Sequence, residues 1–296
     1  MREFDLWGVP FDGGSTLGFP GSRYAPARIR QALAWITQRV QEQQIYSLER
    51  DRILDLPGEL LRDRGDVEVL PHDLEASLRA ASDAVATSLA SGRVPIVLGG
   101  DDSIFFPVAR ALHDHVEGSV GVLHFDAHLD LLDESPYQGR HSQSSGMRRT
   151  LELERVAVED CIQVGPRHFN FPSSGRFKHE TGLRHISAHD AIRLGPEALV
   201  ERLLEAVQGA DHVLLSFDID SIDPAHAPGC GAHEPGGLSS ADALETVRLL
   251  ARHCSALAIT EVNPLMDVRD MTSTLAAYLA VHFAVAGAGT LDKEPS

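Results

Sequence analysis

Short apolar runs alternate with longer amphipathic stretches along nearly the whole chain. The runs are continuously apolar, which is typical of strands buried on both faces, and the stretches between them have helical periodicity. The predicted strands are Phe4–Val9, Val67–Leu70, Val94–Leu98, Ser119–Phe125, Cys161–Val164, His185–Ile186, His212–Phe217 and Ala256–Glu261. The predicted helices are Leu74–Ala90, Ser103–His115, Ala188–Val207, Ser240–His253 and Thr272–Ala286. This order predicts an α/β fold: a three-layer sandwich with a central, mainly parallel sheet of about eight strands.

The segments outside this pattern do not indicate a second domain. Hydrophobic residues make up 43% of the sequence, which is enough for a large core. The polar segment Gln41–Arg64 is predicted to be a surface excursion. We expect a single domain over residues 1–290, followed by a tail at 291–296.

The net charge of the chain excludes some classes of binding partner. The formal net charge is −17, whereas nucleic acids and anionic membrane surfaces require basic patches, so neither is expected as a partner. Three widely spaced cysteines form no zinc or disulfide pattern, and neither a signal peptide nor a membrane span is evident. We therefore expect a soluble, cytoplasmic protein.

Two carboxylate-rich runs each follow a predicted strand. The first run contains Asp126, His128 and Asp130, and the second contains Asp218 and Asp220. Because side chains alternate in an extended segment, the members of each run point to one side. Oxygen ligands with one or two imidazoles suit Mn²⁺ or a neighbouring divalent ion, and a cluster of such ions would offset the charge.

A second interpretation of these runs is structural. Asp residues at strand ends often cap the next helix or form a turn. Two such runs with five aligned ligands are harder to explain in that way, because few lysines or arginines flank them and buried charges need partners. The two runs are therefore better explained as ligands of metal ions.

Two further motifs fall at the ends of predicted strands. Gly-Gly-Asp-Asp-Ser covers positions 99–103, and Glu-Val-Asn-Pro covers positions 261–264. In an open parallel sheet, ligands bind beyond the carboxyl ends of the strands. All four groups of residues are thus predicted to meet at one edge of the sheet.

The set of motifs resembles the ureohydrolase family of arginases and agmatinases. The resemblance covers the chain from Gly8 to about Phe283, and the run from Gly21 to Arg30 is similar to the agmatinase branch. It implies an arginase/deacetylase-like fold, two divalent metal ions per chain (Mn²⁺ first, Ni²⁺ as the alternative) and assembly as a homotrimer or homohexamer.

The resemblance also implies roles for individual residues. Asp126 and Asp218 would bridge the two ions, Asp130 would complete the first site, and His128 with Asp220 would complete the second. Two ions that share a water lower its pKa and supply a hydroxide nucleophile. Glu234 matches a carboxylate that pairs with the substrate guanidinium, a fork-to-fork match; its alternative is a plain loop residue.

The sequence departs from the family pattern at a metal ligand. Most members carry His at the fourth position of Gly-Gly-Asp-x-Ser, where this chain has Asp102. A carboxylate still binds Mn²⁺, although the added negative charge should raise the pKa of the bridging water. The alternative is that Asp102 does not bind metal and the first site is weak.

The second departure lies in the loop after Asp130. Alignment on Arg148 and Arg149 puts Gln143 at the family's proton-shuttle position, with His141 two residues earlier. Glutamine does not exchange protons at neutral pH. The proton must then pass through His141 or water, or His141 is only a surface residue.

Three functions remain open at this point. The first is hydrolysis of a small cationic guanidino compound with release of urea, as in agmatinases. The second is hydrolysis of formiminoglutamate or an N-hydroxyguanidine, since altered metal and shuttle residues suggest a different leaving group. The third is a catalytically quiet subunit that keeps the fold and the metal ions.

Overall fold

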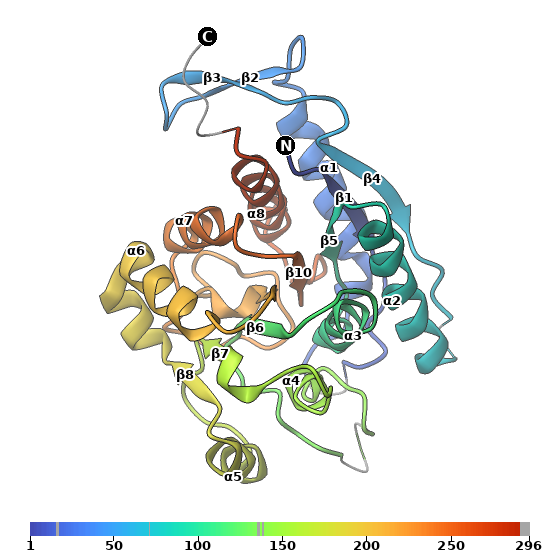
Figure 1. The fold of residues 1–296 in the computed structure, drawn as a ribbon, viewed down its shortest axis with the longest axis vertical. Helices are drawn as coiled ribbons and strands as arrows, with labels where there is room; N and C mark the ends of the chain where they lie inside the picture. Colours follow the sequence, from blue (N-terminus) through green and yellow to red (C-terminus); the bar gives the residue numbers. More distant parts are fainter. Residues whose placement is uncertain (16–17, 71, 135–136, 138, 291–296) are drawn as a thin grey trace.

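The computed structural model describes residues 1–290 except 16–17, 71, 135–136 and 138. Eight parallel strands form the central sheet, in the order β4-β1-β5-β10-β9-β6-β7-β8 (Figure 1). Their bounds are β1 Phe4–Gly8, β4 Leu61–Asp66, β5 Val94–Leu98, β6 Val120–Phe125, β7 Cys161–Val164, β8 Arg184–Ile186, β9 His212–Asp218 and β10 Ala256–Thr260. The mainly parallel eight-stranded sheet predicted from the apolar runs is confirmed.

Helices cover both faces of the sheet. One layer contains α1 (Ala25–Thr37), α6 (Ala188–Ala206), α7 (Ser240–Leu250) and α8 (Met271–Gly287), and the other contains α2 (Leu74–Ala90) and α3 (Phe105–His115). The short helices α4 (Gly146–Thr150) and α5 (Pro172–Thr181) belong to the loops around the carboxyl ends of the strands. Among the described residues, no helix combines the length and the apolarity that crossing a membrane requires.

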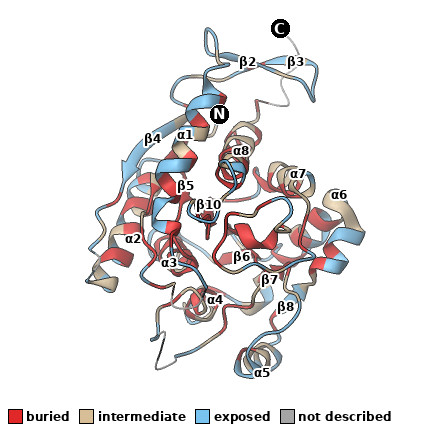
Figure 2. Ribbon diagram, turned by 180° about the vertical axis from the view of Figure 1, so that it is seen from behind, coloured by how far each residue is buried: buried red, intermediate tan, exposed pale blue. Residues whose placement is uncertain are grey.

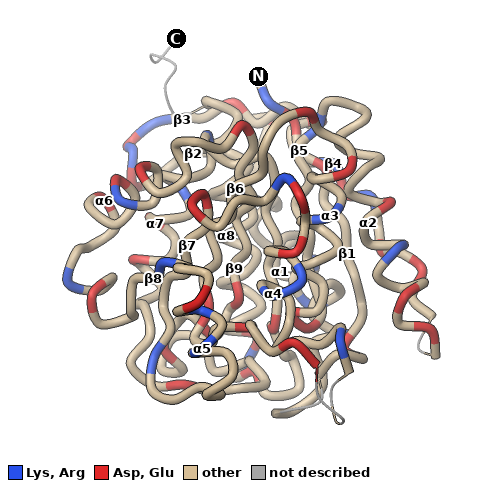
Figure 3. The backbone as a smooth tube through the Cα atoms, turned by 60° about the horizontal axis from the view of Figure 1, so that its bottom comes forward, with Lys and Arg blue, Asp and Glu red and all other residues tan. Residues whose placement is uncertain are grey.

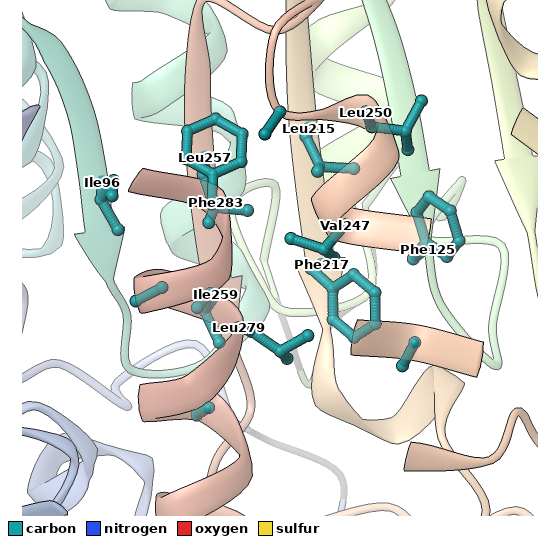
Figure 4. Packing of buried hydrophobic residues seen from close by; sticks show 14 of the residues in the cluster. Ile96, Phe125, Leu215, Phe217, Val247, Leu250, Leu257, Ile259, Leu279 and Phe283 are labelled. Carbon is teal, nitrogen blue, oxygen red and sulfur yellow. The ribbon is translucent and has the colours of Figure 1, made fainter. Parts of the chain in front are cut away.

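The larger hydrophobic core lies between the sheet and the layer that contains α7 and α8. Figure 4 shows the strand side chains of Leu215, Phe217 and Leu257 packed against Val247 and Phe283 of these helices. Helix α8 is buried along most of its length between α1 and α7 (Figure 2). Such a core holds the strands in register and so fixes the positions of the residues that follow them.

Side-chain caps define where several helices begin. Asp73 accepts a hydrogen bond from the Ala76 amide at 2.9 Å, and Ser239 accepts one from the Asp242 amide at 3.0 Å. A cap of this kind satisfies one of the unpaired amides of the first turn and contributes about 1 kcal/mol. The predicted start of α2 at Leu74 and that of α7 at Ser240 agree with the structure for this reason.

The prediction of a strand at Val67–Leu70 was wrong. The strand in this region is β4, Leu61–Asp66, which overlaps the segment predicted to be a surface excursion. It lies at the edge of the sheet, pairs only with β1 and is largely exposed (Figure 2). An exposed edge strand needs backbone pairing but no apolar side chains, so its polar sequence hid it. The rest of the excursion contains the hairpin of β2 (Gln44–Ser47) and β3 (Arg52–Asp55).

Candidate metal centre

Four central strands, β5, β10, β9 and β6, deliver acidic residues to one edge of the sheet. Asp102 follows β5, Glu261 follows β10, Asp218 ends β9 and Asp126 follows β6. All four carboxylates are at least 90% buried. Residues that are far apart in the sequence therefore meet at the carboxyl ends of the strands, as the motif positions predict.

Two overlapping groups of side chains have the geometry of metal sites. The first consists of Asp102, His124, Asp126 and Asp130, and the second of Asp126, His128 and Asp220; within each group the ligand atoms lie within 4.8 Å of one another. Asp126 belongs to both groups. Asp218 belongs to neither, but it lines the cavity beside them.

Local hydrogen bonds orient these carboxylates. The Ala127 amide donates to Asp220 Oδ1 at 2.9 Å, which ties the loop after β6 to the loop after β9. His128 Nδ1 lies 3.0 Å from Asp220 Oδ2 and 3.3 Å from Asp126 Oδ1. His128 thus faces both carboxylates of the second group.

Asp102 is held from the neighbouring strand. Its backbone amide donates to Glu261 Oε1 at 2.8 Å, and Thr260 donates from Oγ1 to Asp102 Oδ1 at 2.7 Å. The other oxygen, Oδ2, lies 3.9 Å from His124 Nε2. Asp102 Oδ2, Asp126 Oδ2 and His124 Nε2 are buried and have no hydrogen-bond partner among the described residues.

The pKa values reflect the crowding of negative charge. Burial, together with the charge of neighbouring carboxylates, raises the pKa of Asp130, Asp218 and Glu261 well above the ordinary range. Burial also opposes ionisation of Asp126, but His124 and His128 outweigh it and lower the pKa of Asp126 well below its usual value. A divalent cation would favour the ionised form of every one of these groups.

The neighbouring carboxylates also change the pKa values of the two imidazoles, His124 and His128. Burial works to lower the pKa of His124, but Asp102 and Asp126 outweigh it and raise that pKa to about 9. For His128, burial is again outweighed, here by Asp220 and Asp126, and the pKa rises to about 11. The cluster offers buried carboxylate oxygens, some of them without a hydrogen-bond partner among the described residues, together with one or two imidazoles. This set of ligands fits hard or borderline divalent ions such as Mn²⁺.

A cavity of about 320 Å³ opens onto this cluster. Its wall combines the carboxylates with the loop that precedes α4 and the segment that leads into α5. The lining residues are Asp102, His128, Asp130, Gln143, Ser144, Phe169, Asn170, Phe171, Pro172, Ser174, Asp218, Asp220, Ala232 and Glu261. The volume suits a small molecule with a short tail.

The comparisons with known proteins agree with this architecture. The sequence model described as the Arginase family matches residues 2–286. The chain belongs to the arginase family. Its relatives include formimidoylglutamase of Bacillus subtilis (32% identity, covering 94% of this chain and 85% of the relative) and guanidinopropionase of Pseudomonas aeruginosa (32%; 93% and 83%). They also include mitochondrial agmatinase of Gallus gallus (34%; 92% and 77%).

Solved arginase-family structures have the same fold. The crystal structure of the Bacillus subtilis formimidoylglutamase superposes with a TM-score of 0.85 at 30% identity, covering 97% of this chain and 87% of that one. The predicted family and fold class are thereby confirmed. The relatives hydrolyse C–N bonds of linear amidines and guanidines, and this arginase-family chain is an enzyme of that class.

The other predicted site residues take different positions around the cavity. Glu234 does not belong to the described lining, but its Oε1 lies 3.8 Å from Nε2 of His128, which does. Gln143 lines the cavity. His141 does not belong to the described lining; its ring stacks on Phe106, with centroids 5.5 Å apart. The catalytic roles of Glu234, His141 and Gln143 remain predictions.

Two residues of the cluster were not predicted from the sequence as site residues. His124 sits inside an apolar strand, where a histidine resembles any other core residue. Glu261 was recognised only as part of a motif, although its position directly after the central strand β10 was a usable signal. Its positive φ of 61° shows that the backbone turns sharply there.

Proposed function

We propose that this arginase-family enzyme hydrolyses a guanidino compound and releases urea, using two divalent ions that share Asp126. The observation that supports the proposal most directly is the membership of Asp126 in both ligand groups. Asp102, Asp130 and Asp218 would complete the first site, and His128, Asp220 and Asp218 the second. When bound, the pair of ions supplies a hydroxide from water near neutral pH. Mn²⁺ is the first expectation, with Ni²⁺ as the alternative.

Carboxylates of the cavity face the substrate in this proposal. Glu261 is buried in the cavity wall, and Glu234 lies beside His128 of that wall. A guanidinium presents a planar fork of N–H donors, which pairs with a carboxylate better than any other group does. The net charge of −17, which Figure 3 shows as acidic segments in many parts of the chain, would also attract a cation.

The backbone loops that carry these groups are joined by Arg167. Its guanidinium donates to the carbonyl of Asp220 at 2.6 Å and to the carbonyl of Glu234 at 2.5 Å. Arg167 is therefore occupied in holding the two loops together, and we assign it a positioning role. Proton exchange with the leaving amine would fall to water held by Gln143, or to His141 after a movement of its loop.

The basic residues near the cavity favour a substrate without a carboxylate. Arg148 contacts Glu152 and Asp133 at 3.5 and 3.6 Å, and Arg140 lies 2.7 Å from Glu152. Arg149 pairs with the same two acidic residues. Since no Lys or Arg belongs to the described lining, an agmatine-like compound fits the cavity better than a guanidino acid does.

Formiminoglutamate is the second candidate. It is favoured by the similarity to formimidoylglutamases, in sequence and in structure. To bind its carboxylates, the enzyme would need one of the paired arginines to exchange Asp133 or Glu152 for the substrate. An N-hydroxyguanidine remains within the same class.

A product screen separates these functions. The purified protein, supplied with Mn²⁺ or with Ni²⁺, is incubated with agmatine, guanidinobutyrate, guanidinopropionate, guanidine, arginine and formiminoglutamate. We expect urea from agmatine. Ammonia without urea, formed only from formiminoglutamate, would replace the leading proposal by the second one. No product from any of these compounds would contradict both proposals.

Assembly and location extend the proposal. We propose a homotrimer or homohexamer in the cytoplasm, on the resemblance to the family alone. Light scattering of the metal-loaded protein gives the mass directly, and a monomeric mass would overturn the assembly.

A further inference from the structure

His124 brings a second imidazole to the carboxylate cluster. Its ring is fully buried at the end of β6, with Nε2 3.3 Å from Asp126 Oδ2 and 3.9 Å from Asp102 Oδ2. A nitrogen in this place fits two roles. It binds a cation if it carries no hydrogen, and it donates to the carboxylates if it does.

The side chain of Gln163 decides between these roles. Its amide nitrogen lies 2.8 Å from the carbonyl oxygen of Leu129 and 3.1 Å from His124 Nδ1. A carbonyl oxygen only accepts, so Leu129 requires the NH₂ end of the amide to face it. The second hydrogen of that NH₂ group is then available to His124 Nδ1, which accepts it.

When the ring is neutral, as the divalent ions of the proposed site would keep it, an imidazole that accepts at Nδ1 carries its hydrogen on Nε2. His124 Nε2 is therefore an N–H that faces Asp126 and Asp102, and it is closed to a metal ion. The ring has little freedom to turn, because it stacks on Phe105 with centroids 4.9 Å apart and an interplanar angle of 10°. Gln163 is itself fully buried in β7.

We propose that His124 is a positioning residue whose Nε2–H stabilises the extra carboxylate that Asp102 brings to the first metal site. Thr260 already donates to Asp102 Oδ1, so Oδ2 is the oxygen turned toward His124. Asp126 Oδ2 faces the same N–H. A donor between two carboxylates reduces their repulsion and holds both for the cation, as groups around metal ligands commonly do. The inference rests on the proposed binuclear site.

The location of the hydrogen can be measured on the whole protein. With ¹⁵N-labelled histidine, long-range ¹H–¹⁵N correlation spectra distinguish protonated from unprotonated ring nitrogens. We expect His124 Nε2 to carry hydrogen both in the metal-free protein and after loading with diamagnetic Zn²⁺. Loss of the Nε2 hydrogen on loading, with a shift of that nitrogen, would make His124 a ligand and overturn the inference.

Two substitutions separate the donor from the ring. His124→Gln keeps an NH₂ group near the place of Nε2, whereas His124→Phe keeps the stacking on Phe105 and removes the donor. We expect His124→Phe to weaken Mn²⁺ binding about 10- to 100-fold, and His124→Gln to restore most of the affinity. The visible spectrum of the Co²⁺-loaded protein should be the same in the Gln variant and the parent, whereas a lost ligand would change it.

The connection to Asp102 is tested in a second background. In Asp102→His the extra negative charge is absent, so His124→Phe should cost much less Mn²⁺ affinity there than in the parent. An equal loss in both backgrounds would show that His124 does not act through Asp102. If His124→Phe does not fold, Gln163→Leu removes the amide without altering any carboxylate of the cluster, and we expect it to allow hydrogen on Nδ1 in the spectra of the Zn²⁺-loaded protein. None of these readouts needs a substrate, so they are independent of the urea assay.

Discussion

Buried carboxylates have different partners at the amino ends of the strands and at their carboxyl ends. At the amino ends of the strands, Asp5 of β1 pairs with Arg93, which lies just before β5; both are buried, and their atoms are 2.6 Å apart. Ser88 donates to the other oxygen of Asp5 at 2.8 Å, and Arg93 also donates to the carbonyls of Phe4 and Glu59, at 2.7 Å each. The two buried charges of this pair are therefore satisfied within the chain.

At the carboxyl ends, the carboxylates face one another, and no Lys or Arg belongs to the described lining of their cavity. The two imidazoles offset only part of their charge. The contrast teaches that the absence of an arginine is as informative as the presence of aspartates. The buried charges at the amino ends compensate each other, whereas the cluster at the carboxyl ends has the composition of a cation site.

Removal of the shared carboxylate should have the largest effect. Asp126→Ala takes one ligand from each group, and Asp218→Ala takes the neighbouring carboxylate proposed as the second bridge. We expect either variant to lose activity altogether and metal content to fall below two ions per chain, measured by elemental analysis. Asp223→Ala, which removes a carboxylate of the loop after β9, serves as the control and should keep both ions. Two retained ions in Asp126→Ala would contradict the assignment.

The opposite edge should respond in stability rather than in chemistry. Asp5→Asn leaves the buried Arg93 with the half-exposed Glu3 as its remaining acidic partner, and breaking a buried pair costs about 3–5 kcal/mol. We expect a loss of that size in the free energy of unfolding from urea denaturation, with metal content still near two. Asp63→Asn, which removes a half-exposed partner of Arg30, is the matched control and should cost less than about 1 kcal/mol.

The metal-free protein should become less stable as the pH rises from 6 to 8. Burial and like charge raise the pKa of Asp130, Asp218 and Glu261, so the folded chain holds protons that the unfolded chain has released above pH ~4. The raised pKa values of His124 and His128, about 9 and 11, add a loss in the same direction above the ordinary histidine value. Melting temperatures in EDTA should therefore fall with pH.

Bound Mn²⁺ should remove or reverse that trend, because metal binding requires the carboxylates to be ionised. The same melting series with Mn²⁺ in place of EDTA provides the comparison. A metal-free protein whose melting temperature rises from pH 6 to pH 8 would contradict the pKa shifts at this edge.

The smallest effect is expected from Asp102→His. The substitution restores the family's ligand and removes one negative charge, so Mn²⁺ should bind more tightly and the activity profile should move to lower pH. Reduced turnover with two ions still bound would mean instead that Asp102 is adapted to a particular substrate or metal. Unchanged metal affinity, pH profile and activity together would place residue 102 outside the coordination sphere.

The sequence was most informative where burial is uniform. β5 and β7 were predicted to the residue, because strands buried on both faces are continuously apolar. The edge strand β4 was missed because its exposed face carries no such pattern, and α1 was missed because its periodicity was not recognised. Edge elements depend on backbone pairing, which leaves little trace in the sequence.

Some residues of the site could likewise be predicted from the sequence, and others could not. Asp126, His128 and Asp220 were predicted as ligands because alternation placed them on one side, and the structure brings them together. His124 was not identified, since its role depends on Gln163 and Asp102, which reach it only through the fold. The exposed Phe169 at the cavity was equally invisible, because an aromatic residue in a loop has no chemistry of its own to detect.

The strand order also determines when the metal centre can form during synthesis. β10 is the last strand to be made, yet it lies between β5 and β9 in the middle of the sheet. A ribosome-bound chain that lacks β10 can bring Asp126 beside Asp220, but it has no Thr260 or Glu261 to hold Asp102. Pairings over such distances form slowly. The complete carboxylate cluster can therefore form only after β10 has entered the sheet, which makes it one of the last parts of the fold to assemble.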